Sequence, residues 1–133
     1  MVPARAEARA LADRLGFSRT DATLIATAIS EVARNILVHA GSGEIVLTPL
    51  YDGARQGLAA VAHDSGPGIR NVDDALRDGY GTKGGLGLGL PGARRLMDEF
   101  ELVSTVGEGT TVTMKKWRRR DDLERLRERT PPP

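Results

Sequence analysis

Three short segments constrain this 133-residue chain more than its composition does. The first, residues 31–35, pairs a glutamate with an asparagine, and the second, residues 64–68, sets an aspartate among glycines. The third, residues 84–90, alternates glycine with leucine. In this order they supply a carboxylate beside a metal-binding amide, an aspartate in a turn, and a glycine-rich loop that opens a helix.

The first segment lies within residues 20–40, which have helical periodicity. An apolar stripe recurs there at helical spacing, formed by Ile25, Ile29, Val32 and Ile36. Glu31 and Asn35 are four residues apart, so they stand one turn above the other beside that stripe. An amide oxygen is a hard ligand suited to Mg²⁺, and a carboxylate one turn away can orient or deprotonate an attacking hydroxyl. A solvated helical face gives the same pattern, so this pair alone decides nothing.

The second segment ends a predicted strand. Residues 58–62 form a short, mostly apolar run, and Asp64, Gly66, Pro67 and Gly68 follow it with a composition that permits a sharp turn. A buried carboxylate in this place can accept a hydrogen bond from an exocyclic amine such as that of adenine, while the glycines leave space for the ring. The same residues also make an ordinary turn after a strand.

The third segment has the composition of a phosphate-binding loop. Its glycines let backbone N–H groups converge on phosphate oxygens, and the helix predicted after it adds its N-terminal dipole. A dinucleotide-binding motif is excluded, because no strand leads directly into the loop and no acidic residue stands at the expected distance. A Walker motif is excluded, because no Gly-Lys-Ser or Gly-Lys-Thr follows. The three segments together predict an ATP site.

As a set, the segments resemble the three motifs of the GHKL ATPase and kinase superfamily, which occur in this order. The closer resemblance is to the small bacterial serine/threonine kinases of partner-switching and stressosome modules, relatives of anti-sigma-factor kinases. It rests on residues 30–36, 78–82 and 89–100 and extends from about residue 8 to residue 117. The resemblance implies an α+β fold of the Bergerat type, a two-layer α/β sandwich whose mixed, mostly antiparallel sheet is covered on one face by helices.

The resemblance also implies roles for residues of the first two segments. Glu31 would be the catalytic base and Asn35 the Mg²⁺ ligand. Asp64 would accept a hydrogen bond from the adenine amine, with Gly66 and Gly68 shaping the pocket around the ring.

Further roles follow for the loop and for a later threonine pair. The residues expected along the phosphates are Gly85, Gly87 and Gly89. Lys83 stands where relatives have a basic residue near the γ-phosphate, although a solvated loop lysine explains it equally well. Thr110 or Thr111 would close the adenine side through a hydroxyl or a bridging water.

The function implied by the resemblance is phosphoryl transfer from ATP to a serine or threonine of a small STAS-domain antagonist. The released kinase would then bind another regulator, such as a phosphatase. A nucleotide-dependent binding module that sequesters a sigma factor shares the same motifs and remains the alternative. A fragment of a gyrase-like clamp is disfavoured, because such machines need a transducer domain.

Composition and charge agree with one compact cytosolic domain. The chain is 40% hydrophobic and 28% charged, it has no cysteine, and it contains no run long enough to span a bilayer. His39 and His63 are far apart in the sequence, so a zinc site is not predicted. A net charge of +1 argues against nucleic-acid binding by the whole surface.

The chain is predicted to divide into a kinase domain, residues 1–117, and a charged tail, residues 118–133, that ends in three prolines. From residue 114 onward eight basic residues stand against four acidic ones. Such a tail can contact an acidic partner or nucleic acid, or it can be simply solvated.

The sequence predicts four helices and four strands. Helices are predicted over residues 4–15, 20–39, 71–78 and 91–99, and strands over residues 44–51, 57–63, 100–106 and 110–117. Relatives usually begin with a strand, whereas residues 2–9 here have helical propensity. The long connection 66–89, rich in glycine, is expected to act as a lid over bound nucleotide.

Overall fold

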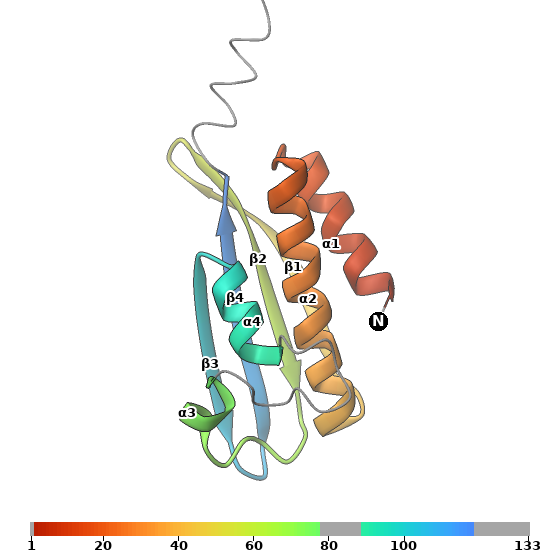
Figure 1. Cartoon of the computed structure of the whole chain (residues 1–133), viewed down its shortest axis with the longest axis vertical. Coiled ribbons are helices and arrows are strands. Elements are labelled where there is room, and N and C mark those ends of the chain that lie inside the picture. The colour runs from red at the N-terminus through yellow and green to blue at the C-terminus, as the bar shows by residue number, and fades with distance from the viewer. Residues whose placement is uncertain (1, 78–88, 119–133) are drawn as a thin grey trace, which may run out of the picture.

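The computed structural model describes residues 2–77 and 89–118, with side chains from residue 4. These residues form an α+β structure with helices on one side of a sheet (Figure 1). The elements in chain order are α1 (Val2–Arg14), α2 (Arg19–Ala40), β1 (Glu44–Asp52), β2 (Arg55–Asp64), α3 (Val72–Ala75), α4 (Gly89–Leu96), β3 (Glu99–Thr105) and β4 (Gly109–Trp117).

The four strands form one sheet in the order β1-β2-β4-β3. Every neighbouring pair in it is antiparallel, so the described part of the sheet is wholly antiparallel rather than mixed. The last residue of β2, Asp64, pairs with Thr110 near the start of β4. Two segments of the predicted site, far apart in sequence, therefore meet at one end of the sheet.

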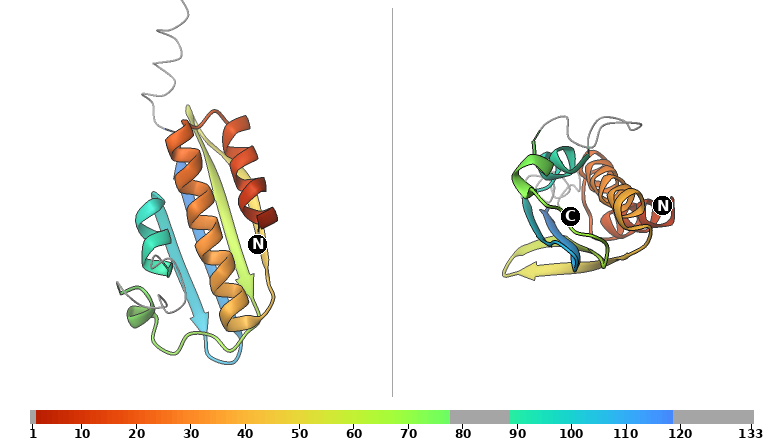
Figure 2. Two further views of the ribbon diagram at one scale, coloured as in Figure 1. Left: turned by 45° about the vertical axis from the view of Figure 1, so that its right-hand side comes forward. Right: turned by 90° about the horizontal axis from the view of Figure 1, so that it is seen from below.

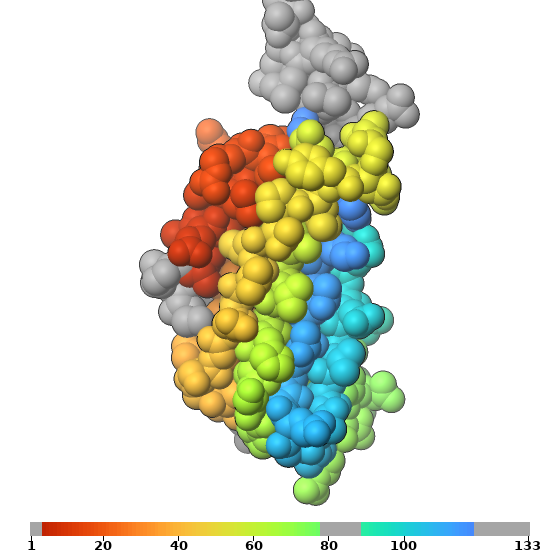
Figure 3. All heavy atoms as spheres, turned by 180° about the vertical axis from the view of Figure 1, so that it is seen from behind, coloured from red at the N-terminus to blue at the C-terminus, as the bar shows by residue number. Residues whose placement is uncertain are grey.

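The helices cover only one face of this sheet, as expected. Figure 2 shows α2 and α4 lying along that face, with α1 packed beside α2. Seen from behind, the four strands lie side by side with no described helix crossing them (Figure 3). None of the helices in residues 2–77 and 89–118 is long and apolar enough to cross a membrane.

The core lies between α2 and the two central strands. The apolar stripe predicted on α2 is confirmed, because its four members are each no more than 3% exposed. They face alternate residues of the sheet, namely Leu58, Ala60 and Ala62 of β2 and Val112 and Met114 of β4, which are all buried. This alternation follows from the pleat, which sends successive side chains to opposite faces. Each central strand thus contributes one apolar face to the core.

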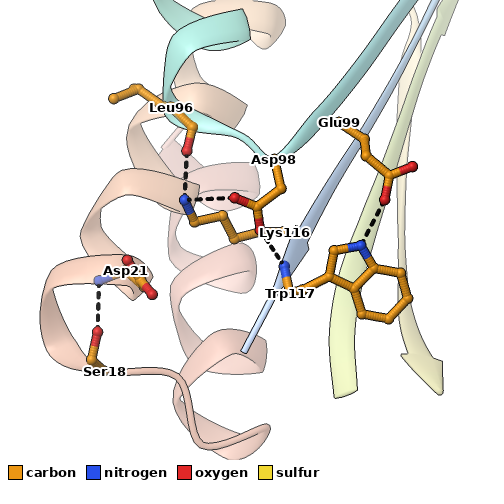
Figure 4. Close-up of polar contacts among 7 residues, drawn as sticks. All are labelled: Ser18, Asp21, Leu96, Asp98, Glu99, Lys116 and Trp117. Atoms are coloured by element: carbon orange, nitrogen blue, oxygen red, sulfur yellow. Dashed lines mark hydrogen bonds and ion pairs between the residues drawn. The ribbon is translucent and has the colours of Figure 1, made fainter. Parts of the chain in front are cut away.

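Helix α2 is fixed at both ends. At its start the side chain of Ser18 accepts a hydrogen bond from the N–H of Asp21 at 3.1 Å, an N-cap that satisfies a donor left free by the helix (Figure 4). At its end Gly41, with a φ of 80°, donates its N–H to the carbonyl of Ile36 at 3.0 Å. The glycine is needed there because other residues rarely adopt a positive φ.

The junction of α4 and β3 differs from the sequence prediction. The helix spans Gly89–Leu96 instead of residues 91–99, and β3 begins at Glu99. Figure 4 shows the cause: Lys116 Nζ donates to the carbonyl of Leu96 at 3.0 Å and lies 3.5 Å from Asp98 Oδ1. Asp98 Oδ2 in turn accepts the N–H of Trp117 at 2.8 Å. These contacts to β4 end the helix before Asp98.

A polar cluster on the open face of the sheet surrounds Trp117. Its indole N–H donates to Glu99 Oε2 at 2.6 Å (Figure 4). The guanidinium carbon of Arg55 lies 4.1 Å from the centroid of the indole ring, a cation–π contact. The cluster stands at the end of β4 opposite to Thr110.

The N-terminal segment is helical, as its composition predicted. Helix α1 packs on α2, with Ala8 and Ala12 completely buried. At the other end, Arg118, the first residue of the predicted tail, contacts the domain. Its N–H donates to the carbonyl of Gln56 at 2.8 Å, and its guanidinium donates to the carbonyl of Leu15 at 3.1 Å. The remainder of the predicted tail lies outside the described residues.

Candidate nucleotide-binding site

The predicted site residues that the structure describes lie on the second half of α2, at the end of β2 and at the starts of α4 and β4. Contacts between these elements link the residues: the N–H of Gly89 bonds the carboxylate of Glu31, and a Cβ built on Gly66 would lie 2.5 Å from the Cβ of Ala40, the last residue of α2. These contacts join the first segment to the start of α4 and the end of α2 to the turn after β2.

Glu31 and Asn35 lie on the part of α2 that faces the start of α4. Glu31 is 7% exposed, and its Oε2 accepts the N–H of Gly89 at 3.0 Å. Because Gly89 is the first residue of α4, the positive end of that helix also favours a carboxylate here. Asn35 follows one turn later and is half-buried. The pair thus places a buried carboxylate and a more accessible amide next to each other.

Asp64 ends β2 with a nearly buried carboxylate, 5% exposed. Its Oδ1 accepts the N–H of Gly66 at 2.9 Å, which fixes the side chain over the turn that follows. Among the described residues no group bonds the other oxygen, Oδ2. A buried carboxylate with one free oxygen fits the exocyclic amine of a base, because that amine supplies the missing donor.

The glycines around Asp64 are needed for close approach. A Cβ on Gly109 would lie 2.0 Å from the carbonyl oxygen of Asp64, and a Cβ on Gly68 would lie 2.5 Å from the carbonyl oxygen of Thr105. Both have a positive φ, 124° and 79° respectively. Gly43 was missed by sequence analysis, although a Cβ there would lie 2.6 Å from the carbonyl oxygen of His63. No motif marks Gly43, which follows the end of α2.

The structure separates the two threonines that sequence analysis left open. Thr110 pairs with Asp64, is 5% exposed, and lies on the helix-covered face together with it. Thr111 points to the opposite face, where its Oγ1 lies 2.9 Å from Nδ1 of His63, an exposed strand residue. Thr111 therefore does not belong to the same pocket wall as Asp64, because adjacent strand residues face opposite ways.

Ser104 is a polar residue that sequence analysis missed. Its Oγ accepts the N–H of Ile69 at 2.7 Å, lies 2.8 Å from Oγ1 of Thr110, and lies 3.2 Å from the carbonyl oxygen of Gly109. The N–H of Gly107 also donates to the carbonyl of Pro67 at 2.8 Å. The β3–β4 hairpin thus holds the loop after Asp64. The signal that sequence analysis could have used is the alternation along β3: Ser104 follows Phe100 and Leu102 at every second position and therefore lies on the core side.

Part of the predicted site lies outside the described residues. This applies to Lys83, Gly85 and Gly87 and to residues 78–88 of the expected lid, of which the structure describes residues 66–77 and Gly89. Within residues 2–77 and 89–118 no three His, Cys, Asp or Glu side chains gather in a metal-binding group. The donor chemistry fits Mg²⁺ held by Asn35 together with nucleotide phosphates, since Mg²⁺ in such sites takes few protein ligands.

Comparison with known proteins agrees with this geometry. The sequence matches the Histidine kinase-like ATPase domain family over residues 1–116. The chain therefore belongs to the histidine kinase-like ATPase domain family.

Individual proteins similar to this chain make the comparison more specific than the family does. The chain is 49% identical over 119 residues to the serine/threonine-protein kinase RsbT of Bacillus subtilis, covering 90% of each chain. It is 37% identical over 103 residues to the anti-sigma F factor of Priestia megaterium, covering 71% of this chain and 68% of the relative. The anti-sigma F factor of Anoxybacillus flavithermus is 32% identical over 120 residues, covering 85% of this chain and 81% of the relative.

Proposed function

We propose that this chain is an ATP-dependent serine/threonine protein kinase of a bacterial partner-switching stress-signalling module. It phosphorylates a STAS-domain antagonist and, once released from it, binds a downstream regulator such as a phosphatase. The observation that carries the proposal is the buried carboxylate of Glu31 at the opening of α4, one turn from Asn35. The 49% identity to a protein named as a serine/threonine kinase supports it.

The pocket wall formed by Asp64 and Thr110 supports adenine as the base. Asp64 Oδ2 accepts a hydrogen bond from the exocyclic amine, and Gly66 and Gly68 leave room for the ring. Asn35 and Gly89 lie toward the phosphates, where the N-terminal end of α4 favours negative charge. When bound, Mg²⁺ neutralises charge on the phosphates during transfer.

In this proposal Glu31 is the base for the acceptor hydroxyl. Its Oε2 is held by the N–H of Gly89, which leaves Oε1 for the incoming hydroxyl. The hydroxyl oxygen attacks the γ-phosphorus, its proton passes to Glu31, and ADP leaves. Because phosphoryl transfer needs little covalent chemistry from the protein, positioning of these groups supplies most of the catalysis.

A second candidate is a nucleotide-dependent binding module of the anti-sigma type, without physiological kinase activity. It is favoured by the relatives that are named anti-sigma F factor. Both candidates need the ATP pocket, and only the kinase needs Glu31 as a base. We place either activity in the cytoplasm, with a protein as the partner and with no role for a membrane or for nucleic acid.

The test is incubation of the purified chain with labelled ATP and candidate STAS-domain proteins encoded by neighbouring genes. The kinase proposal expects a phosphorylated serine or threonine on one of them, located by mass spectrometry. If the chain binds a STAS-domain protein or a sigma factor tightly but never transfers phosphate, the binding module is the better description. We propose that residues 1–117 form the kinase domain and residues 118–133 a charged tail.

A further inference from the structure

Ser104 joins two parts of the pocket that the sequence motifs do not connect. Its hydroxyl accepts the N–H of Ile69 in the loop after Asp64, at 2.7 Å, and it lies 2.8 Å from the hydroxyl of Thr110 on β4. Thr110 stands directly opposite Asp64 in the β2–β4 ladder. Side chains at such paired positions have Cβ atoms about 5 Å apart, close enough to contact the same edge of a flat ring.

The single proton of Ser104 decides what Thr110 offers to a ligand. A hydroxyl has one proton to donate and two lone pairs to accept with. If Ser104 donates to Thr110, the proton of Thr110 is available to a ligand. If Ser104 donates to the Gly109 carbonyl instead, Thr110 donates to Ser104 and presents only lone pairs.

The distances favour the first arrangement. O–H···O hydrogen bonds are most often about 2.7–2.8 Å long and rarely exceed about 3.0 Å. The 2.8 Å separation from Thr110 fits a hydrogen bond donated by either hydroxyl, whereas 3.2 Å is long for donation from Ser104 to the Gly109 carbonyl, so the proton of Ser104 is better placed toward Thr110. The N–H of Ile69 occupies one lone pair of Ser104 and does not compete for its proton. The chain Ile69 N–H to Ser104 to Thr110 therefore ends in an O–H that can donate.

We propose that Ser104 is a positioning residue for base specificity, which makes Thr110 a hydrogen-bond donor beside the acceptor Asp64. This inference rests on the proposed ATP site. Adenine presents an amine donor at N6 and an acceptor at N1 side by side, and this pair matches Asp64 Oδ2 and the Thr110 hydroxyl. Guanine presents an acceptor at O6 and an N–H at N1, so both contacts would be mismatched.

The experiment compares nucleotide analogues that differ by one ring atom. Affinities of wild type and Ser104→Ala are measured by calorimetry for ATP, 1-deaza-ATP and 7-deaza-ATP. The 1-deaza analogue keeps the amine but has C–H in place of N1, and the 7-deaza analogue keeps N1. Wild type should bind 1-deaza-ATP about three- to tenfold more weakly than ATP, the usual scale of one net hydrogen bond.

The Ser104→Ala variant should lose that discrimination. Its affinity for ATP and 7-deaza-ATP should fall about three- to tenfold, while its affinity for 1-deaza-ATP stays within about twofold of wild type. Ser104→Thr, which keeps a hydroxyl on the strand, should restore the preference for ATP. Thr113→Val, on the open face of the neighbouring strand β4, is the matched control and should behave as wild type.

A purely structural role for Ser104 predicts a different result. Loss of the Ile69 contact alone would lower the affinity for all three nucleotides equally. That outcome would overturn the proposed role of Ser104 in orienting the Thr110 hydroxyl, while the proposed ATP binding would stand. Unchanged affinities in Ser104→Ala would overturn it as well. A wild-type chain that binds none of the nucleotides would instead overturn the proposed function, and with it the proposed role of Ser104. In a double-mutant cycle, Thr110→Val combined with Ser104→Ala should cost no more than Thr110→Val alone.

Discussion

The N–H of Gly89 donates a 3.0 Å hydrogen bond to Oε2 of Glu31, so the first residue of α4 is tied to the middle of α2. Glutamine at position 31 can accept this bond but cannot take a proton at neutral pH. We predict that Glu31→Gln keeps ATP affinity within about twofold and slows phosphate transfer at least about a hundredfold, the scale of a general base. Phosphate incorporation into the STAS partner is measured beside nucleotide affinity, with the exposed Glu101→Gln as control. Transfer at the wild-type rate would exclude the base role.

Asn35 is predicted to matter only when the metal is present. Asn35→Ala removes an amide oxygen from the half-buried side of α2, and alanine supplies no ligand in its place. Affinity for Mg·ATP should fall at least about tenfold, or about 1.4 kcal/mol. The same titration in EDTA is the control, since the metal-free affinities of variant and wild type should agree. Equal affinities with Mg²⁺ would remove Asn35 from the site.

Asp64→Asn tests the base pocket without removing its turn. The amide oxygen can still accept the N–H of Gly66, but an N–H now stands where Oδ2 would accept from the ligand. We predict that ATP affinity falls at least about tenfold while the melting temperature changes by only a few degrees. Asp13→Asn, exposed on α1, is the control. A variant that melts normally and binds ATP as well as wild type would contradict the assignment.

Gly109 and Gly107 form a matched pair for measuring close packing at the pocket. Both have a positive φ, but a Cβ on Gly109 would lie 2.0 Å from Asp64 O, whereas a Cβ on Gly107 would meet nothing within 4 Å. Gly107→Ala should cost about 1–2 kcal/mol of unfolding free energy from backbone strain alone. Gly109→Ala should cost at least about 1 kcal/mol more, because the clash forces backbone to move. Urea unfolding of both variants gives the comparison, and equal losses would show that the 2.0 Å approach relaxes freely.

Lys116 is predicted to stabilise the end of α4. Its ammonium is buried with Leu96 O and Asp98 as partners. Lys116→Met keeps most of the apolar stem but leaves that carbonyl without its donor, which should lower the free energy of unfolding by about 1–3 kcal/mol. Lys115→Met, one residue earlier and facing the open side of the sheet, should change it by no more than about 0.5 kcal/mol. An equal loss of unfolding free energy in the two variants would argue against a stabilising role of Lys116 at the end of α4.

The helices and strands could be predicted from local patterns, whereas the roles of the site residues came from the family resemblance and stay predictions. The stripe on α2, with Ile25 and Ile29 among its members, has a period that only a helix satisfies, and the turn residues after Asp64 mark the end of β2. The family resemblance predicted that the three segments lie together in one ATP site, which the local patterns alone do not predict. The register that pairs Asp64 with Thr110 confirms that these two segments meet.

What the sequence could not give are contacts made across the fold. The end of α4 is set by Lys116, about twenty residues later, so helical propensity placed it at residue 99 instead of Leu96. The choice between Thr110 and Thr111 depends on strand register, which a shift of one residue reverses. Ser104 carries no motif, and its role follows only from the three groups around its hydroxyl.

The position of Trp117 makes the chain its own optical probe. It is the single tryptophan of the sequence, held between Arg55 and Glu99 at the far end of β4. Trp117 stands seven positions after Thr110 along β4, which amounts to roughly 24 Å. Its fluorescence should therefore change when the sheet unfolds and stay silent when nucleotide is added. Stability and ligand titrations can thus be recorded on one unlabelled sample without one signal contaminating the other.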